Sequence, residues 1–441
     1  MSLKNSTVTK PEIKIIKDID TSDKWWCDAA VLFSVKNGKN TICELAGRED
    51  DDYEYNLQMQ MNGVPLVQGH FPCCPTCKGM LAAGYGIENV DSPEFEAARN
   101  CMNSAFISVW DSAEKIKPLL GLLGDGLYAL ADVLCFPSDG DGHFFYDVSS
   151  ELRYYDAACY GYYCNWDYSC TDHFPLFLYP TQSASLINNE RVEYYAQIMR
   201  TEKNPPRALA YHLYGFMNVL LDGHHKACAA ASLGKVIRCL TIIPCDGSEI
   251  DMSTVVRGVN YKVSNPGIKT LRFAGLKTDA EKGIKYLDIY REDNCGADVE
   301  IKHYPVTDAK IHYGPDTYPT ISDLAALFNA GEKIERLLPD FDPEVISGLT
   351  YEDTDETDRF LEAIIHFLAA IDQDSAYKAA CSIVKKGDGF MRHRRVKASL
   401  LFLLNYRDEE TEQIFVDFYL AHEEHDENWN IANSYWKDRK D

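Results

Sequence analysis

Short apolar runs bounded by turn residues mark the middle of the chain. Residues 216–221 are mostly apolar, which predicts a buried strand. Residues 227–233 are small and favour a helix, and Gly234 ends that segment. Residues 236–243 are rich in β-branched and aliphatic side chains, which predicts a second core strand. The pattern therefore predicts strand, helix and strand in close succession.

A helix and a further strand are expected just upstream. The apolar face of this helix consists of Val192, Tyr195, Ala196 and Met199. Pro205 and Pro206 end the helix, and residues 208–212 predict a strand that enters a hairpin at Gly215. Together with the segments above, these elements predict one α/β unit over residues 175–245.

The last hundred residues have the periodicity of helices. Apolar positions recur at helical spacing in residues 360–371, 376–384, 396–404, 414–419 and 429–436. Acidic loops separate these segments. The pattern resembles a HEAT-like antiparallel stack, although the sequence shows no strict repeat. Such a stack docks on its own chain or on a protein partner, and we do not expect catalysis there.

We expect an α+β protein of four regions. Residues 1–125 form an N-terminal α+β region with a strand at 30–35, a hairpin at Asn37-Gly38, and helices around 94–106 and 113–123. Residues 126–255 hold the α/β unit and its approach loop. Residues 256–340 form an α+β extension that packs on this unit, and residues 341–441 form the helical domain, with a boundary near residues 339–343.

The charge balance argues against binding to nucleic acid. The 441 residues include 68 acidic and 44 basic side chains, which gives a net charge of −24. A chain this acidic repels phosphate backbones unless it carries a strong basic patch. The one basic cluster is Arg392, His393, Arg394, Arg395 and Lys397. We interpret it as a solvated helix face.

The sequence predicts a soluble, cytoplasmic protein without a membrane segment. No stretch of 18 residues is uninterruptedly apolar, and the polar N-terminus lacks the hydrophobic core of a signal peptide. The 15 cysteines are odd in number and irregularly spaced, which favours reduced thiols over a disulfide framework.

A cysteine cluster suggests a metal site. Cys74 and Cys77, just after Cys73, form a Cys-x-x-Cys knuckle followed by Gly79, which has the form of half a zinc site. The other ligands would come from His70, Cys43, Cys101 or the group Cys159, Cys164, Cys170 and His173. A redox knuckle and two idle buried thiols are the alternatives. The acidic loop that contains Asp139, Asp141 and Asp147 matches no EF-hand, and we interpret it as turns.

The segment Asp222-Gly223-His224-His225-Lys226 carries the clearest chemistry. It lies at the turn between the first predicted strand and the small-residue helix. Glycine lets a ligand approach the backbone closely, and the free amides of a helix N-terminus favour an anion. Two imidazoles and an ammonium group add donors for a phosphate. The alternative is that Asp222 only caps the helix and the histidines are internally satisfied polar groups.

This turn and its element order resemble the ParB/sulfiredoxin-like superfamily, over residues 175–245. The resemblance implies that Gly223, His224, His225 and Lys226 hold nucleotide phosphates, with lysine where the family usually has arginine. The turn is closest to that of a free-serine-kinase branch. Sulfiredoxin chemistry needs a cysteine at the position of His224, so that activity is excluded, and the arginine-rich nucleotide patch of ParB is also missing.

Two classes of function follow from this interpretation. In the first, the α/β unit is a phosphotransferase or nucleotide hydrolase that acts on a small molecule with ATP or ADP and Mg²⁺. Asp222 would bind Mg²⁺ directly or through water, Glu190 or Glu193 would act as general base, and Arg191 would neutralise the transferred charge. In the second, the unit is an inert scaffold in an interaction or immunity-type module with a protein partner on its C-terminal helices. A carboxylate of residues 190–193 close to Lys226 would favour the enzyme.

Overall fold

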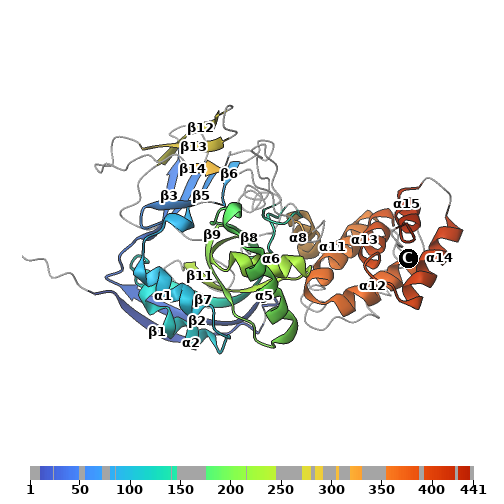
Figure 1. Cartoon of the computed structure of the whole chain (residues 1–441), viewed down its shortest axis with the longest axis horizontal. Helices are drawn as coiled ribbons and strands as arrows, with labels where there is room; N and C mark the ends of the chain where they lie inside the picture. Colours follow the sequence, from blue (N-terminus) through green and yellow to red (C-terminus); the bar gives the residue numbers. More distant parts are fainter. Residues whose placement is uncertain are drawn as a thin grey trace, which may run out of the picture. The chain divides into compact units, whose positions relative to one another are not determined.

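The computed structural model divides the chain into two compact units, Met1–Asp316 and Thr317–Asp441, which are described separately (Figure 1). The structure describes residues 10–22, 24–48, 55–71, 80–84, 86–140, 142–146, 175–214, 216–244, 271–279, 284–291, 304–306, 318–329, 354–386, 392–422 and 426–437.

A seven-stranded mixed sheet is the centre of the first unit, with the order β1-β2-β7-β11-β9-β10-β8. Its strands are β1 (Glu12–Ile19), β2 (Cys27–Lys36), β7 (Gly126–Cys135), β11 (Ile237–Pro244), β9 (Ala208–Tyr214), β10 (Met217–Asp222) and β8 (Phe177–Tyr179). The neighbours β1, β2, β7 and β11 are antiparallel, as are β9 and β10. Strand β9 runs parallel to β11, and β10 runs parallel to β8.

The central α/β prediction is confirmed at the level of its elements. The apolar run at residues 216–221 becomes β10, and the run at 236–243 becomes β11, both almost entirely buried. Helix α6 (His224–Ser232) lies between them in sequence, and α5 (Asn189–Thr201) precedes β9. Because apolar runs bounded by glycine and proline carry local information, these elements could be located from the sequence.

Further helices pack in the first unit. They are α1 (Pro93–Cys101), α2 (Val109–Lys115) and α3 (Lys117–Leu120), with the short 3₁₀ turns η1 (Ile87–Asn89) and η2 (Ala184–Leu186). Ser92 and Ser108 cap α1 and α2 by accepting the amides of Phe95 and Asp111. The helix expected around residues 94–106 is shorter than predicted and ends at Cys101.

The expected hairpin at Asn37-Gly38 is wrong. The chain leaves the large sheet at this point and enters a separate antiparallel sheet with the order β3-β4-β5-β6. Its strands are β3 (Ile42–Arg48), β4 (Tyr55–Met61), β5 (Val64–Phe71) and β6 (Met80–Ala82). An Asn-Gly hairpin does occur at Asn62-Gly63 between β4 and β5, where both residues have positive φ. Strands β12 (Leu271–Asp279), β13 (Ile284–Arg291) and β14 (Tyr304–Val306) form a third sheet.

The second unit is helical in the part that the structure describes, which confirms the helices predicted within residues 341–441. Its helix at Ile321–Asn329 lies in the stretch that the sequence assigns to the α+β extension. Its helices are α8 (Ile321–Asn329), α11 (Asp355–Ile371), α12 (Gln373–Lys385), α13 (His393–Leu403), α14 (Glu409–Ala421) and α15 (Glu427–Ser434). Thr354, Asp372 and Asp408 cap α11, α12 and α14 through their side chains. The apolar faces recognised in the sequence are buried between these helices.

None of the helices in the described ranges is both long enough and apolar enough to cross a membrane.

Candidate functional site

The turn from β10 into α6 requires glycine at position 223. Gly223 has a φ of 105° and is the N-cap residue of α6. A Cβ atom there would lie 2.7 Å from the Cβ of Ala208 at the start of β9. Any larger residue would combine a strained backbone with a steric clash. Glycine therefore lets the first turn of α6 pack directly on the neighbouring strand.

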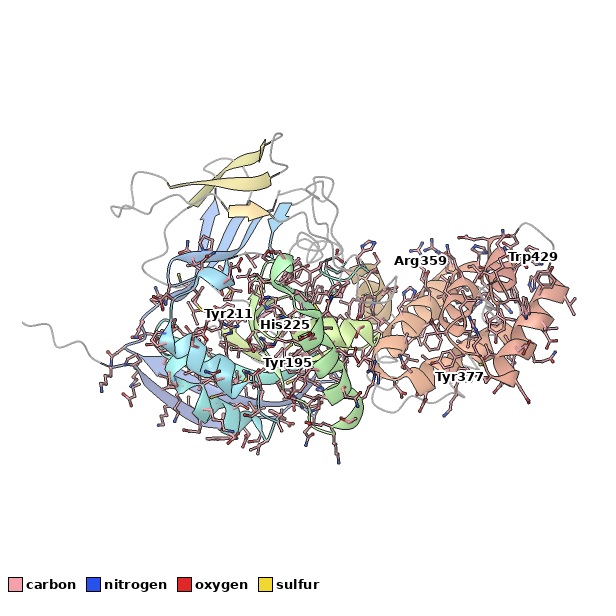
Figure 2. The ribbon with its side chains drawn as sticks, in the orientation of Figure 1. Tyr195, Tyr211, His225, Arg359, Tyr377 and Trp429 are labelled. Atoms are coloured by element: carbon pink, nitrogen blue, oxygen red, sulfur yellow. The ribbon has the colours of Figure 1, made fainter. Side chains whose placement is uncertain are left out.

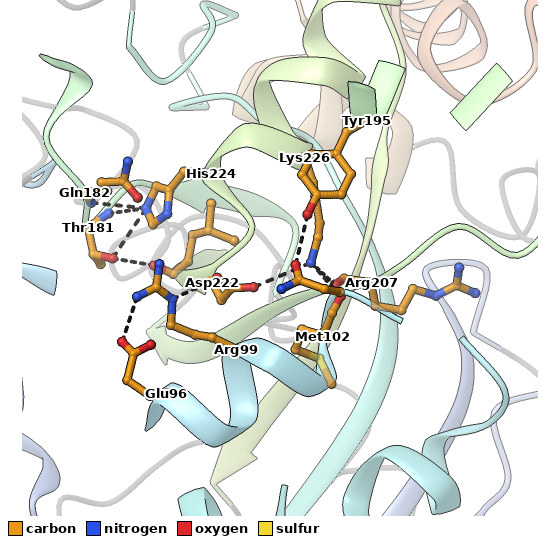
Figure 3. A network of polar contacts seen from close by, with 12 residues as sticks. Glu96, Arg99, Met102, Thr181, Gln182, Tyr195, Arg207, Asp222, His224 and Lys226 are labelled. Carbon is orange, nitrogen blue, oxygen red and sulfur yellow. Dashed lines mark hydrogen bonds and ion pairs between the residues drawn. The ribbon is translucent and has the colours of Figure 1, made fainter. Parts of the chain in front are cut away.

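His224 accepts hydrogen bonds from the loop that follows β8. Its side chain is buried, and its Nε2 accepts the backbone amides of Thr181 at 2.9 Å and Gln182 at 3.1 Å (Figure 3). Burial, with smaller contributions from the charges of His225 and Arg99, lowers the pKa of His224 to about 3. The ring is therefore neutral at pH 7 and carries its proton on Nδ1.

His225, labelled in Figure 2, ties α6 to the start of α5. Its Nε2 accepts the backbone amide of Asn188, the N-cap residue of α5, at 3.0 Å. Burial and the positive charge of Arg191 are the main causes that lower the pKa of His225 to about 4. This half-buried ring is also neutral at pH 7, so that its Nδ1–H is a hydrogen-bond donor.

Lys226 points into the protein. Its Nζ donates to the carbonyl oxygens of Met102 at 2.7 Å and Arg207 at 2.9 Å, and lies 3.5 Å from Asp222 Oδ2 (Figure 3). It also lies 5.6 Å from the ring centroid of Tyr195. Burial lowers the pKa of Lys226, and the Asp222 carboxylate opposes this shift. The ammonium group therefore connects three segments of the fold.

Asp222 does not cap α6, so the capping alternative is wrong. The N-cap residue is Gly223, and α6 has no side-chain capping bond. Instead Asp222 Oδ1 lies 3.3 Å from Arg99 Nε, and Oδ2 lies 3.5 Å from Lys226 Nζ. Arg99, from the C-terminal end of α1, also donates to Glu96 at 2.9 Å. Both carboxylate oxygens of Asp222 are thus paired with cations.

The first turn of α5 brings a cation to the site. Arg191 is the main charge that acts on His225, and it acts more weakly on Lys226 than Asp222 does. Glu190 is exposed, and the exposed Glu193 lies 3.4 Å from Arg200 farther along the helix. Within the described ranges, no ion pair joins Lys226 to a carboxylate of residues 190–193. The proximity that would favour an enzyme therefore stays a prediction.

The local charge at the start of α6 is positive in an otherwise acidic chain. The charges that act most on His225 are those of three cations, Arg191, Arg99 and Lys226, and of the Asp222 carboxylate, while Arg99 also pairs with Glu96. The first intrahelical bond of α6 runs from the Ala227 amide to the Gly223 carbonyl. The amides of residues 224–226 precede it and have no acceptor within the helix. They form the positive end of the helix dipole.

The metal predictions fall mostly outside the described residues. Cys73, Cys74 and Cys77 lie there, as do Cys159, Cys164, Cys170, His173, Asp141 and Asp147, so the zinc site stays a prediction. No group of three or more His, Cys, Asp or Glu side chains suited to a metal occurs in the part that the structure describes. Asp139 is buried in a turn, where its side chain accepts the His143 amide at 3.3 Å.

The basic cluster of the helical unit is only partly solvated. Arg395 is buried, and its Nε lies 3.4 Å from Asp358. Arg394 is exposed, and Lys397 pairs with Glu427. The interpretation as a solvated face is therefore wrong for Arg395, because α13 turns that side chain toward α11.

Sequence reasoning missed the partners that complete this region. Arg99 lies more than a hundred positions before Asp222, and Thr181 and Gln182 contact His224 through backbone amides, with the Thr181 hydroxyl 3.4 Å from His224 Nε2. It also missed Glu44 on β3, whose Oε1 accepts the hydroxyl of Tyr211 on β9 at 2.6 Å. No local pattern identifies such long-range pairs. Glu44 in particular looks like any other charged residue in a strand.

Comparisons with models of known protein families, with curated proteins and with solved structures find no match.

Proposed function

We propose that the first unit binds the phosphate group of a nucleotide, such as ATP or ADP, or of another small phosphorylated ligand, at the start of α6. One observation carries this proposal. Arg191 and Arg99 act on His225 at the positive end of the helix dipole, where the amides of residues 224–226 lack helical acceptors. The likeness of the turn to ParB/sulfiredoxin-like proteins supports the same ligand class.

The side chains of the motif have different roles in this proposal. The backbone amides of residues 224–226, the Nδ1–H of His225 and the guanidinium of Arg191 hold the phosphate. His224 and Lys226 act as positioning residues, since Nε2 of His224 and Nζ of Lys226 already hold backbone groups of neighbouring segments. The lysine in place of the usual arginine fits this inward, structural role.

The arrangement supports binding better than phosphoryl transfer. Mg²⁺ prefers free carboxylate oxygens, whereas both oxygens of Asp222 are paired with Arg99 and Lys226. Asp222 in this state does not fit a direct Mg²⁺ ligand. Glu190 or Glu193 as general base would also have to approach from exposed positions on α5. The proposed activity is therefore ligand binding, in a cytoplasmic protein.

The second candidate is a non-catalytic protein-interaction or immunity-type module on an inert scaffold. It is favoured by the observation that His224, Lys226 and Asp222 all have partners within the fold. The motif would then only fasten β10 and α6 to their neighbours. The C-terminal helices, which expose Leu401 and Leu420, would bind the protein partner.

Arg191→Gln will weaken phosphate binding, whereas Arg200→Gln on the same helix will not. Arg191 acts on His225, and Arg200 lies in the last turn of α5. Loss of one charge-assisted contact of about 1.5 kcal/mol lowers affinity by roughly tenfold. Isothermal titration calorimetry with ATP, ADP and inorganic phosphate, with and without Mg²⁺, measures this.

Comparison of the two variants distinguishes binding at a specific phosphate site from unspecific electrostatic attraction. Equal weakening by both substitutions would indicate unspecific attraction, and binding unchanged by Arg191→Gln would place the ligand elsewhere. No binding of any of the three ligands by the wild-type protein would overturn the proposal and favour the interaction module.

A further inference from the structure

His366 joins two helices of the second unit. Helix α8 packs against α11, and His366 Nδ1 lies 3.1 Å from Asp323 Oδ2 in the first turn of α8. The same oxygen accepts the backbone amide of Thr320 at 2.7 Å and its hydroxyl at 2.9 Å. The carboxylate that binds Thr320 at the start of α8 is therefore also the contact that fastens this helix to α11.

The surroundings of His366 favour its charged form. Although burial disfavours the imidazolium, the hydrogen bond and ion pair with Asp323 and the nearby Glu362 raise the pKa of His366 above its ordinary value of 6.5. Against the effect of burial, the bond to His366 and those from Thr320 lower the pKa of Asp323. Asp323 therefore stays ionised, and the proton of His366 controls the strength of the pair.

Other charged groups near the pair lie on α11 and α13. Glu362 precedes His366 by one helical turn, and burial raises its pKa. Arg394 on α13 lies 3.8 Å from Glu362, so its charge is directed at that carboxyl group. The charges that act on His366 itself are those of Asp323 and Glu362. Deprotonation of His366 thus removes the counter-ion of Asp323, whereas Glu362 keeps its contact with Arg394.

Apolar side chains on the described part of α8 are also buried, namely Ile321, Leu324 and Leu327. Apolar contacts have no preference for one pH, so the pair of Asp323 with His366 is a titrating part of this contact.

We propose that His366 and Asp323 form a proton-operated clasp, which holds α8 on α11 while His366 is protonated and releases it as the pH rises. The sign follows from the raised pKa. The stabilisation that the His366–Asp323 pair gives is complete below the ordinary histidine pKa of 6.5. It is lost as the pH rises through the higher pKa that His366 has while α8 is docked. Release would uncover the apolar surface of α11 beneath α8.

Hydrogen–deuterium exchange of the full chain, with rates corrected for intrinsic pH dependence, tests the clasp. Between about pH 6 and about pH 8.5, the protection factors of residues 318–329 are expected to fall severalfold, while those of α12 stay constant. In His366→Gln this pH dependence is lost. The matched control is His393→Gln, because His393 also faces a carboxylate, Glu427 at 3.3 Å, but at an exposed position.

A measurement on the wild-type protein keeps the proposal testable if His366→Gln does not fold. An NMR titration of the histidine rings is expected to give His366 a pKa above 6.5. A pKa below this value would overturn the clasp, as would constant protection of α8 across the pH range. A fall in protection that persists in folded His366→Gln would assign the effect to another group.

Discussion

Lys226→Met is expected to destabilise the first unit by about 3–5 kcal/mol, the cost of removing one partner from a buried charged cluster. Methionine has a similar length but cannot donate a hydrogen bond. The carbonyl groups of Met102 and Arg207 would lose the Nζ donor, and Asp222 would lose one of its two cations. Urea unfolding followed by circular dichroism measures the loss.

The matched control is Lys203→Met at an exposed position after α5, which is expected to change stability by less than about 0.5 kcal/mol. A stable Lys226→Met variant that has lost phosphate binding would contradict the structural role. It would instead make Lys226 a direct phosphate ligand, as the family resemblance implies.

Glu44→Gln is expected to raise the free energy of unfolding at pH 8 by about 2–4 kcal/mol. This is less than the free energy that corresponds to the whole pKa shift of Glu44, because Glu44 keeps some solvent contact. Burial raises the pKa of Glu44 from 4.5 to about 8, against the effect of the Tyr211 hydrogen bond. Folding therefore requires proton uptake between these values. The contribution of Glu44 to the free energy of unfolding of the wild type falls as the pH rises from 4.5 and levels off above 8.

Glutamine keeps an acceptor for the Tyr211 hydroxyl (Figure 2) and does not titrate. Urea unfolding at several pH values between these limits compares the wild type with Glu44→Gln. Glu12→Gln, exposed on the edge strand β1, is the control and should keep the wild-type pH dependence. Parallel stability curves for wild type and Glu44→Gln would show that Glu44 is ionised in the folded protein at neutral pH.

Elements with strong local signals could be predicted from the sequence. Strands β10 and β11 follow from apolar runs, and the left-handed turn at Gly223 follows from glycine between a strand and a helix. The helices of the second unit follow from their apolar periodicity in the same way. In each case the residues that determine the element lie within the element or beside it.

The direction of each side chain in the candidate site could not be predicted. Lys226 turns inward because carbonyl groups of Met102 and Arg207 come together there, which depends on how α1 and β9 pack. The histidines accept amides rather than donate because the loop after β8 and the start of α5 present N–H groups to them. The prediction of a hairpin at Asn37-Gly38 is wrong for a similar reason. The next strand, β3, pairs with β4 in another sheet and not with β2.

The central claim is that phosphate binds to the amides at the start of α6. The most direct measurement is a titration of ¹⁵N-histidine-labelled protein with ATP, followed by the amide signals of His224 and His225. We predict that both signals shift in proportion to occupancy, while the His393 and His422 amides of the second unit do not move. Saturable ATP binding without a change at His224 and His225 would contradict the account.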